Sequence, residues 1–320
     1  MPGLKMLLTD IAWPDSVIES ELCDSAGVKL TIAPDADEKT LIQHASNADA
    51  IVTCWAHVTQ AVIAATAGRC KVVTRMGIGL DNIDVDYCSA HQIPVTNVPD
   101  YCLQEVAEHT LASIFTLGRQ LATFHQRTKQ GNYQRDVSPP IRRIQGQTLG
   151  IVGLGNIGQR VAALAQSVGL HVVGNRRDMN KPVPGVTLLP LQELLAVSDY
   201  ISLHLPLTDG NQHMISDSEF ALMKKTAFLI NTARGGLVNH KALATALQQN
   251  IIAGAALDVQ DPEPPDLSMP PFNDPRVIIS PHAAFVSEES LHDLRYRSIE
   301  NTLNILLGNS GTNIVNQHAL

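Results

Sequence analysis

A glycine-rich turn between a short apolar segment and a helical pattern constrains this chain more than any other feature. Residues 148–177, TLGIVGLGNIGQRVAALAQSVGLHVVGNRR, contain G-x-G-x-x-G at Gly153, Gly155 and Gly158. An apolar strand pattern precedes the glycines, an amphipathic helix pattern follows over 156–168, and a second apolar strand comes next. This context is typical of a dinucleotide-binding unit, whereas a bare motif would also fit an ordinary glycine-rich turn.

Each glycine has its own physical role in such a unit. Gly153 permits the tight turn, Gly155 lets the backbone approach a pyrophosphate, and Gly158 lets the helix and strand pack closely. The phosphates then lie on the free N–H groups of the helix N-terminus, where the helix dipole favours an anion. We therefore expect Asn156 and Ile157, in the first helical turn, to be cofactor neighbours together with the three glycines.

Short apolar strands alternate with amphipathic helices along the chain. Such alternation predicts parallel sheets that are covered by helices on both faces. The strand pattern forms two series, and it restarts at Gly146 after a long helical stretch over 103–129 and a turn-rich segment. The first series is 5–8, 50–54, 71–74 and 94–96; the second is 148–152, 171–174, 200–203, 227–230, 254–257 and 277–280.

Two series of strands imply two α/β domains, each a doubly wound parallel sheet. We expect a flavodoxin-like substrate-binding domain of residues 1–100 and 286–320, with a Rossmann domain of residues 101–285 inserted in it to bind the dinucleotide. The last helix pattern, over 286–307, is expected to pack back on the first domain, so that the chain crosses twice beside a cleft. The tail from 308 onward is expected to fray.

Composition and charge exclude several classes of protein. With 44% hydrophobic and 17% charged residues the chain is not disordered, and no apolar run is long enough to span a membrane. A net charge of −8 disfavours nucleic acid and anionic membranes as partners. The five cysteines lack C-x-x-C spacing and no H-E-x-x-H motif occurs, so we expect neither a disulfide framework nor a metal site. The N-terminus lacks a signal-peptide pattern, which makes the reducing cytoplasm the expected location.

The residues after the second strand of the glycine-rich unit indicate which dinucleotide binds. A carboxylate there would accept hydrogen bonds from the ribose 2′-hydroxyl of NAD and repel the 2′-phosphate of NADP. The chain instead has Asn175, Arg176 and Arg177. Two guanidinium groups suit a dianionic 2′-phosphate, so we expect NADP(H) to be preferred over NAD(H). The alternative is that both arginines belong to a solvated turn.

Reactive side chains follow three later strand patterns. Arg234 comes after AFLI, Glu263 after GAAL, and His282 after VII. Because ligands of open α/β sheets bind beyond the carboxyl ends of the strands, these three can converge on one crevice. Each residue taken singly also fits a role without catalysis. Arg234 could form a surface ion pair, Glu263 could be an exposed glutamate in a proline-rich loop, and His282 could be a structural histidine.

Together the three side chains match what hydride transfer to or from an alcohol requires. The hydroxyl must lose a proton to a base that titrates near neutrality, which histidine supplies. A carboxylate beside the imidazole fixes its tautomer and stabilises the imidazolium. A planar guanidinium grips a substrate carboxylate with two hydrogen bonds. We therefore expect Arg234, Glu263 and His282 to be the catalytic residues.

The motifs GLGNIG, NTARGGLV, ALDV with EP five residues on, and SPHAA resemble the D-isomer-specific 2-hydroxyacid dehydrogenase family over residues 72–307. The resemblance implies that Arg234 binds the substrate carboxylate, that His282 is the acid/base and that Glu263 lies behind it. It also implies a homodimer, with the helix near 103–129 as the contact. The same resemblance implies further cofactor neighbours at His204, Pro206, Thr232, Ala233, Asp258, His282 and Ala284, and substrate contacts from Met76, Gly77, Ile78 and Gly79 as well as Arg234 and His282.

Three functions remain open from the sequence. RMGIGLDNID and SPHAAFVSE resemble phosphoglycerate-dehydrogenase-like and C-terminal-binding-protein-like members, whereas the Asn-Arg-Arg segment resembles NADPH-dependent glyoxylate/hydroxypyruvate reductases. The first 100 residues carry six basic and thirteen acidic side chains, which disfavours a phosphate ester despite Arg75. We therefore expect an oxidoreductase that transfers hydride between NADP(H) and a small 2-oxo or D-2-hydroxy acid. The alternatives are an NAD-dependent D-3-phosphoglycerate dehydrogenase and a nucleotide-sensing scaffold.

Overall fold

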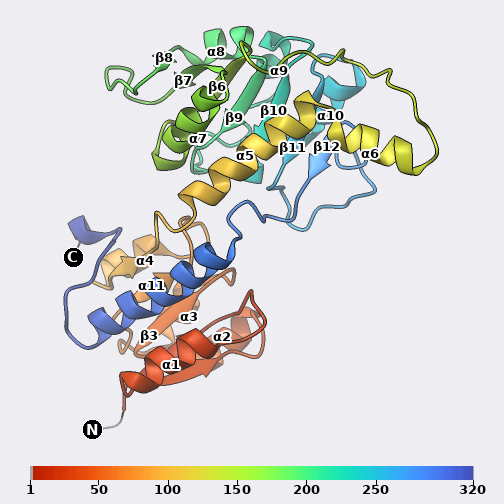
Figure 1. Ribbon diagram of the computed structural model, residues 1–320. Helices are drawn as coiled ribbons and strands as arrows, with labels where there is room; N and C mark the ends of the chain where they lie inside the picture. The colour runs from red at the N-terminus through yellow and green to blue at the C-terminus, as the bar shows by residue number, and fades with distance from the viewer. Residues whose placement is uncertain (1–2, 320) are drawn as a thin grey trace. The chain divides into compact units, whose positions relative to one another are not determined.

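The computed structural model describes residues 3–319, which divide into two α/β units (Figure 1). One unit contains the described residues up to Tyr101 together with those from Ser287 onward. The other unit runs from Cys102 to Val286. The chain therefore enters the second unit once and returns to the first through the segment before the last helix.

The first unit is built on a five-stranded parallel sheet. Its strand order, β2-β1-β3-β4-β5, is the flavodoxin-like doubly wound order that was expected. Met6 of the first strand pairs with Ala50 of the third, which places the first strand inside the sheet. The strands are β1 (Lys5–Leu8), β2 (Lys29–Ile32), β3 (Ala50–Thr53), β4 (Val73–Arg75) and β5 (Val95–Thr96).

Alternate residues of β1 point to opposite faces of this sheet. Leu7 packs with the face covered by α2 (Glu38–Ala45), α3 (Gln60–Ala64) and α4 (Val85–Ala90). Met6 and Leu8 pack with the opposite face, which α1 (Val17–Ser25) and α11 (Glu288–Leu306) cover. The last helix, in blue in Figure 1, thus completes the core of the N-terminal unit, as its sequence position predicted.

Two features of this unit differ from expectation. The edge strand β2 escaped prediction because KLTI is only partly buried and carries a charge at its start. The tail was expected to fray, and this was wrong: Ile314 pairs antiparallel with Thr96, and the N–H of Val315 donates to the carbonyl of Val95 at 2.9 Å. The buried amide of Asn316 also bonds the backbone at Ile93 and Val95, and a 3-10 turn (Gln317–Ala319) follows.

The second unit is built on a seven-stranded parallel sheet in the order β12-β11-β10-β9-β6-β7-β8. This is the Rossmann order with one additional strand, and it confirms the predicted fold class. The short strand β8 was missed because VTL lies among turn residues. The strands are β6 (Thr148–Val152), β7 (His171–Asn175), β8 (Val186–Leu188), β9 (Tyr200–Leu203), β10 (Phe228–Asn231), β11 (Gly254–Leu257) and β12 (Val277–Ile279).

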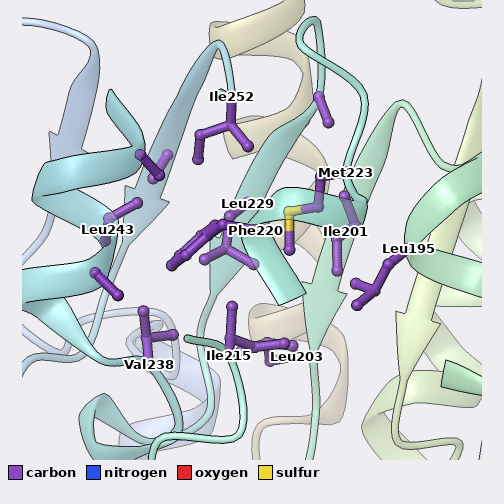
Figure 2. Packing of buried hydrophobic residues seen from close by; sticks show 14 of the residues in the cluster. Leu195, Ile201, Leu203, Ile215, Phe220, Met223, Leu229, Val238, Leu243 and Ile252 are labelled. Carbon is purple, nitrogen blue, oxygen red and sulfur yellow. The ribbon is translucent and has the colours of Figure 1, made fainter. Parts of the chain in front are cut away.

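Helices cover both faces of the second sheet. One face packs against α8 (Leu191–Val197), α9 (Asp217–Leu222) and α10 (His240–Gln248), and Figure 2 shows Phe220 and Met223 between strand and helix side chains of this cluster. The opposite face packs against α5 (Leu103–Gly118) and α7 (Asn156–Ser167). The central strands are therefore buried on both sides, and their carboxyl ends carry the loops that matter for function.

The helical stretch expected over 103–129 is two helices, α5 and α6 (Leu121–Lys129). Gln120 between them adopts the left-handed conformation, with φ of 55°, which ends the first helix. Gly118 lies so close to Tyr200 that an added methyl group would be 2.3 Å from the phenol oxygen. Within residues 3–319, no helix combines the length and apolar character needed to cross a bilayer.

Candidate active site

The glycine-rich turn after β6 leaves open space above the N-terminus of α7. Gly153 has a φ of +101°, and a methyl group there would lie 2.3 Å from the carbonyl oxygen of His204. A methyl group on Gly158 would lie 2.0 Å from the carbonyl oxygen of Gly153. On Gly155 it would meet nothing within 4 Å, and no side chain caps this helix. The turn thus fits a pyrophosphate, because the helix N-terminus offers N–H donors beside an open glycine.

The end of β7 carries an amide and two cations in place of a carboxylate. The Asn175 side chain donates to the carbonyl of Leu189 at 2.9 Å, and the half-buried Arg176 reaches the carbonyl of Lys181 at 3.4 Å. Arg177 is exposed. The nearby Asp178 carboxylate accepts from the N–H of Asn180 at 3.0 Å, as in an ordinary turn. The strand end is therefore basic.

Four other candidate cofactor neighbours lie in the loops after β9 and β10. The ring of His204 shares a 2.8 Å hydrogen bond with the hydroxyl of Ser202, and burial lowers the pKa of His204 to about 4, so this ring is neutral at neutral pH. Pro206 follows, and its carbonyl accepts from Asn211. The hydroxyl of Thr232 is 3.3 Å from that of Thr110 on α5, and the N–H of Ala233 donates to Asn231.

His282 and Glu263 form a close pair at the carboxyl edge of the sheet. Nδ1 of His282 donates to Oε2 of Glu263 at 2.9 Å, and both side chains remain partly exposed. The other carboxylate oxygen accepts from the N–H of Gln260 at 2.8 Å. Burial alone would raise the pKa of Glu263, but the hydrogen bond and charge of His282 and the Gln260 N–H together lower it. The carboxylate is thus ionised at neutral pH, and it holds the imidazole through Nδ1, so that Nε2 is the ring nitrogen that Glu263 does not engage.

Asp258 fixes the loop that carries His282. This side chain is 2% exposed, and one oxygen accepts from the Ser280 hydroxyl at 2.6 Å and the Ala283 N–H at 2.9 Å. The other oxygen accepts from the N–H of Ala284 at 2.9 Å. The clamp matters because His282 has a φ of 51°, a conformation that costs a non-glycine residue about 1–3 kcal/mol. Asp258, and the Ala284 N–H with it, therefore serve the loop itself.

Arg234 lies on a loop that packs against the loop of Glu263. The buried side chain of Asn231 donates to the Arg234 carbonyl at 2.8 Å, which shapes the turn after β10. A methyl group on Gly235 would lie 2.1 Å from the Gln260 carbonyl, so only glycine allows this approach. The Arg234 guanidinium donates to the carbonyl of Ala233 at 2.7 Å. The loops of Arg234, Glu263 and His282 thus meet at adjacent strand ends.

The candidate substrate loop, Met76 to Gly79, lies at the carboxyl end of β4 in the first unit. The carbonyl of Gly77 accepts from the N–H of Val98 at 3.0 Å, and that of Ile78 accepts from the Asn97 amide at 2.8 Å. The buried Arg75 donates to the carbonyl of Met76, and its guanidinium lies 5.4 Å from the centre of the Trp55 ring. The loop is therefore held from both sides within its own unit.

Two contributors to the histidine loop carried no recognisable sequence signal. His109 on α5 lies 3.1 Å from the Ser280 hydroxyl, which accepts this bond because it gives its own proton to Asp258. Gln260 bonds both the Leu257 and the Ser280 carbonyls. A lone histidine in a helix and a glutamine in a loop match no spacing rule, so only tertiary contacts reveal them. Among the described residues, no group of three or more His, Cys, Asp or Glu side chains is arranged to hold a metal ion.

Comparison with known proteins agrees with this arrangement. The family model of the D-isomer specific 2-hydroxyacid dehydrogenase NAD binding domain matches residues 111–284. A glyoxylate reductase of Aeropyrum pernix is 34% identical over 88% of this chain and 87% of that protein. A D-3-phosphoglycerate dehydrogenase of Methanocaldococcus jannaschii is 34% identical over 98% of this chain, which spans 59% of that protein. The solved D-lactate dehydrogenase of Aquifex aeolicus, complexed with NAD and lactic acid, has a TM-score of 0.86 and 30% identity over 95% of this chain and 96% of that one.

Proposed function

The chain belongs to the D-isomer-specific 2-hydroxyacid dehydrogenase family, and on that premise we propose that it reduces a small unphosphorylated 2-oxo acid, such as glyoxylate or hydroxypyruvate, with NADPH. It is an NAD(P)-dependent D-2-hydroxyacid oxidoreductase. The observation that carries the proposal is the His282–Glu263 pair, joined at 2.9 Å on a clamped loop at the carboxyl edge of the nucleotide-binding sheet. A binding scaffold has no use for an ionised carboxylate held against an imidazole.

The mechanism assigns one role to each of three side chains. The nicotinamide, when bound, supplies the hydride that reduces the carbonyl carbon. Arg234 binds the carboxylate of the 2-oxo acid with two parallel hydrogen bonds. His282 enters as the imidazolium and donates its Nε2 proton to the carbonyl oxygen as that oxygen becomes a hydroxyl. Glu263 keeps the Nδ1 proton directed away from substrate and stabilises the charged ring before transfer.

The first unit would supply the substrate-binding loop and the second unit the cofactor site. We propose that the backbone of Met76, Gly77, Ile78 and Gly79 contacts the acid end of the substrate. The cofactor site draws on the turn from Gly153 to Gly158 and on His204, Pro206, Thr232 and Ala233. Because the Asp258 carboxylate and the Ala284 N–H are bonded to each other, these two would line the nicotinamide site mainly by fixing the backbone.

The side chains at the end of β7 support the proposed preference for NADP(H) over NAD(H). Arg176 and Arg177 present two cations where NAD-dependent enzymes place a carboxylate, and the Asp178 carboxylate is engaged by its own turn. A 2′-phosphate is dianionic and prefers this environment to the uncharged ribose hydroxyl. We therefore assign NADP(H) as the preferred cofactor.

The contacts of Arg75 support our proposal that the substrate is an unphosphorylated acid. This arginine is 8% exposed, donates to the Met76 carbonyl and lies over the Trp55 ring. A guanidinium that supports the substrate loop in this way is poorly placed to neutralise a phosphate ester as well. NAD-dependent oxidation of D-3-phosphoglycerate is the second candidate, favoured by the presence of a cation beside that loop.

A substrate panel with both cofactors tests the proposal. We expect reduction of glyoxylate or hydroxypyruvate, followed by the loss of nicotinamide absorbance, with a KM for NADPH at least about tenfold below that for NADH, equivalent to about 1.4 kcal/mol. A tenfold preference for NADH refutes the cofactor assignment. Higher kcat/KM with 3-phosphoglycerate establishes the second candidate, and cofactor binding without turnover on any acid establishes a scaffold.

Arg234→Lys should weaken substrate capture more than catalysis. A lysine ammonium keeps the charge but cannot make two parallel bonds to a carboxylate, so KM for the 2-oxo acid should rise about 10- to 100-fold with a smaller change in kcat. Steady-state kinetics measures this split. Arg276→Lys, which alters an ion pair with Asp274 in the same unit, is the matched control and should leave KM unchanged. An unaltered KM in Arg234→Lys removes this residue from the carboxylate site.

We also assign the enzyme to a homodimer in the cytoplasm. The exposed side chains of Leu121 at the start of α6 and of Tyr133 after it are the residues we expect a subunit contact to cover. The cytoplasmic assignment rests on the cysteine pattern of the sequence, which lacks the spacing of a disulfide framework. Light scattering of the purified chain measures the mass that decides between monomer and dimer.

A further inference from the structure

Gln260 lies where the three candidate catalytic loops meet. It follows β11 by three residues and is 6% exposed, although nothing in the proposed chemistry calls for a glutamine there. A buried polar side chain costs stability unless its hydrogen bonds are made, so its partners indicate its role. Its contacts lie within its own loop and reach the loops of His282 and Arg234.

The Gln260 side chain ties the ends of two parallel strands together. Its amide nitrogen donates to the carbonyl of Leu257, the last residue of β11, at 3.0 Å and to the carbonyl of Ser280, just after β12, at 3.3 Å. The Ser280 N–H donates to the same Leu257 carbonyl at 3.1 Å, which closes a ring between the two strand ends. Ser280 is two residues before His282, so this ring sets where the histidine loop begins.

The Gln260 backbone contacts Glu263 within its own loop and Gly235 in the Arg234 loop. Its N–H donates to Oε1 of Glu263 at 2.8 Å, while Oε2 of the same carboxylate holds His282. Its carbonyl lies against Gly235, where an added methyl group would be 2.1 Å from the oxygen. Gln260 therefore orients the carboxylate directly and provides the surface on which the Arg234 loop packs.

We propose that Gln260 is a positioning residue, whose side-chain amide holds the Glu263 and His282 loops in register so that the carboxylate stays on the imidazole. This proposal rests on the proposed function, because it assigns Gln260 a part in the same proton transfer. No substrate or cofactor contact is required of it. The role belongs to the two amide hydrogens, since they alone bridge the carbonyls of Leu257 and Ser280.

Hydrogen exchange of the full-length protein tests the positioning without any need for activity. Gln260→Met keeps the length of the side chain but removes both donors, so peptides covering 258–265 and 280–284 should both exchange faster, by about tenfold. Gln166→Met is the matched control, since it removes an amide bond to the Pro184 carbonyl elsewhere in the unit, and both peptides should keep wild-type rates. Wild-type exchange in either peptide of Gln260→Met overturns the proposal. If Gln260→Met does not fold, Gln260→Asn, whose shorter amide cannot reach both carbonyls, replaces it with the same expectation.

A double-mutant cycle then separates positioning from a general structural role. Gln260→Met should lower kcat by about ten- to a hundredfold while the KM for NADPH changes less than about twofold. Once Glu263→Gln has weakened the pair, adding Gln260→Met should cost little more, because both changes remove the same hold on His282. Multiplicative losses of kcat in the double variant overturn the proposal. A wild-type enzyme that reduces no acid would refute the proposed function instead, and the exchange result would still decide whether Gln260 links the two loops.

Discussion

Replacing His282 with alanine is expected to lower kcat for 2-oxo acid reduction by about two to four orders of magnitude. Glu263 holds Nδ1 of this imidazole, and Nε2 is the nitrogen assigned to proton donation, so the loss of the ring removes the proton donor of the proposed reaction. Cofactor affinity should stay within about twofold, because the glycine-rich turn after β6 is untouched. Steady-state kinetics and a fluorescence titration with NADPH measure the two quantities.

The backbone at His282 calls for a second variant. Its φ of 51° is unfavourable for alanine but is tolerated by asparagine, which occupies left-handed conformations more readily. His282→Asn should therefore match His282→Ala in its loss of kcat while unfolding closer to the wild-type temperature. Turnover that survives in either variant assigns proton donation to another group. A loss of cofactor binding in His282→Asn would mean that the loop, and not the imidazole, was the essential element.

Replacing Arg295 with methionine is expected to destabilise the first unit by about 3–5 kcal/mol. Arg295 on α11 donates to both carboxylate oxygens of Glu19 on α1, at 2.8 and 2.7 Å, and Glu19 is fully buried. The same guanidinium bonds Asp15 at 2.8 Å and lies 5.2 Å from the centre of the Trp13 ring. Removing the cation leaves the Glu19 carboxylate buried without its counter-charge, which is the costly case for a buried pair.

Urea unfolding followed by tryptophan fluorescence measures this loss, because both tryptophans, Trp13 and Trp55, lie in the first unit. Arg297→Met is the matched control, since its pair with Asp100 is half exposed on the same helix and should contribute less than about 1 kcal/mol. Adding Glu19→Leu to Arg295→Met should recover part of the loss, because it removes the stranded charge. If Arg295→Met unfolds like Arg297→Met, the buried pair does not stabilise the joining of α1 and α11.

Local pattern was enough to predict the architecture of both sheets. The strands β6, β9, β10 and β11 are buried at nearly every position, and strands of this kind pair in parallel between two helix layers. The elements that escaped prediction lie where pattern is weak. The strands β2 and β8 are partly exposed edges, and the break between α5 and α6 lies at Gln120, which adopts the left-handed conformation.

In the candidate site, too, some residues could be predicted from the sequence and others could not. Arg234, Glu263 and His282 stand out in sequence because each lies in the loop that follows an apolar strand and has a chemically reactive or charged side chain. The groups that hold them do not, since Asp258, Gln260 and His109 act through hydrogen bonds to residues up to 171 positions away. No periodicity encodes such a contact, because it depends on which strand ends become neighbours when the sheet forms.

By itself the sequence determined which segments become strands and helices, that they form two parallel α/β sheets, and where the glycines allow a phosphate to approach. These properties depend on residues close together in the chain, through side-chain period and backbone freedom. Only the tertiary structure decided that the 2.9 Å contact of Glu263 with His282 rests on Asp258 and Gln260, and that Arg295 meets Glu19 across 276 positions. Those contacts depend on strand order and helix packing, which bring together groups that no local spacing relates.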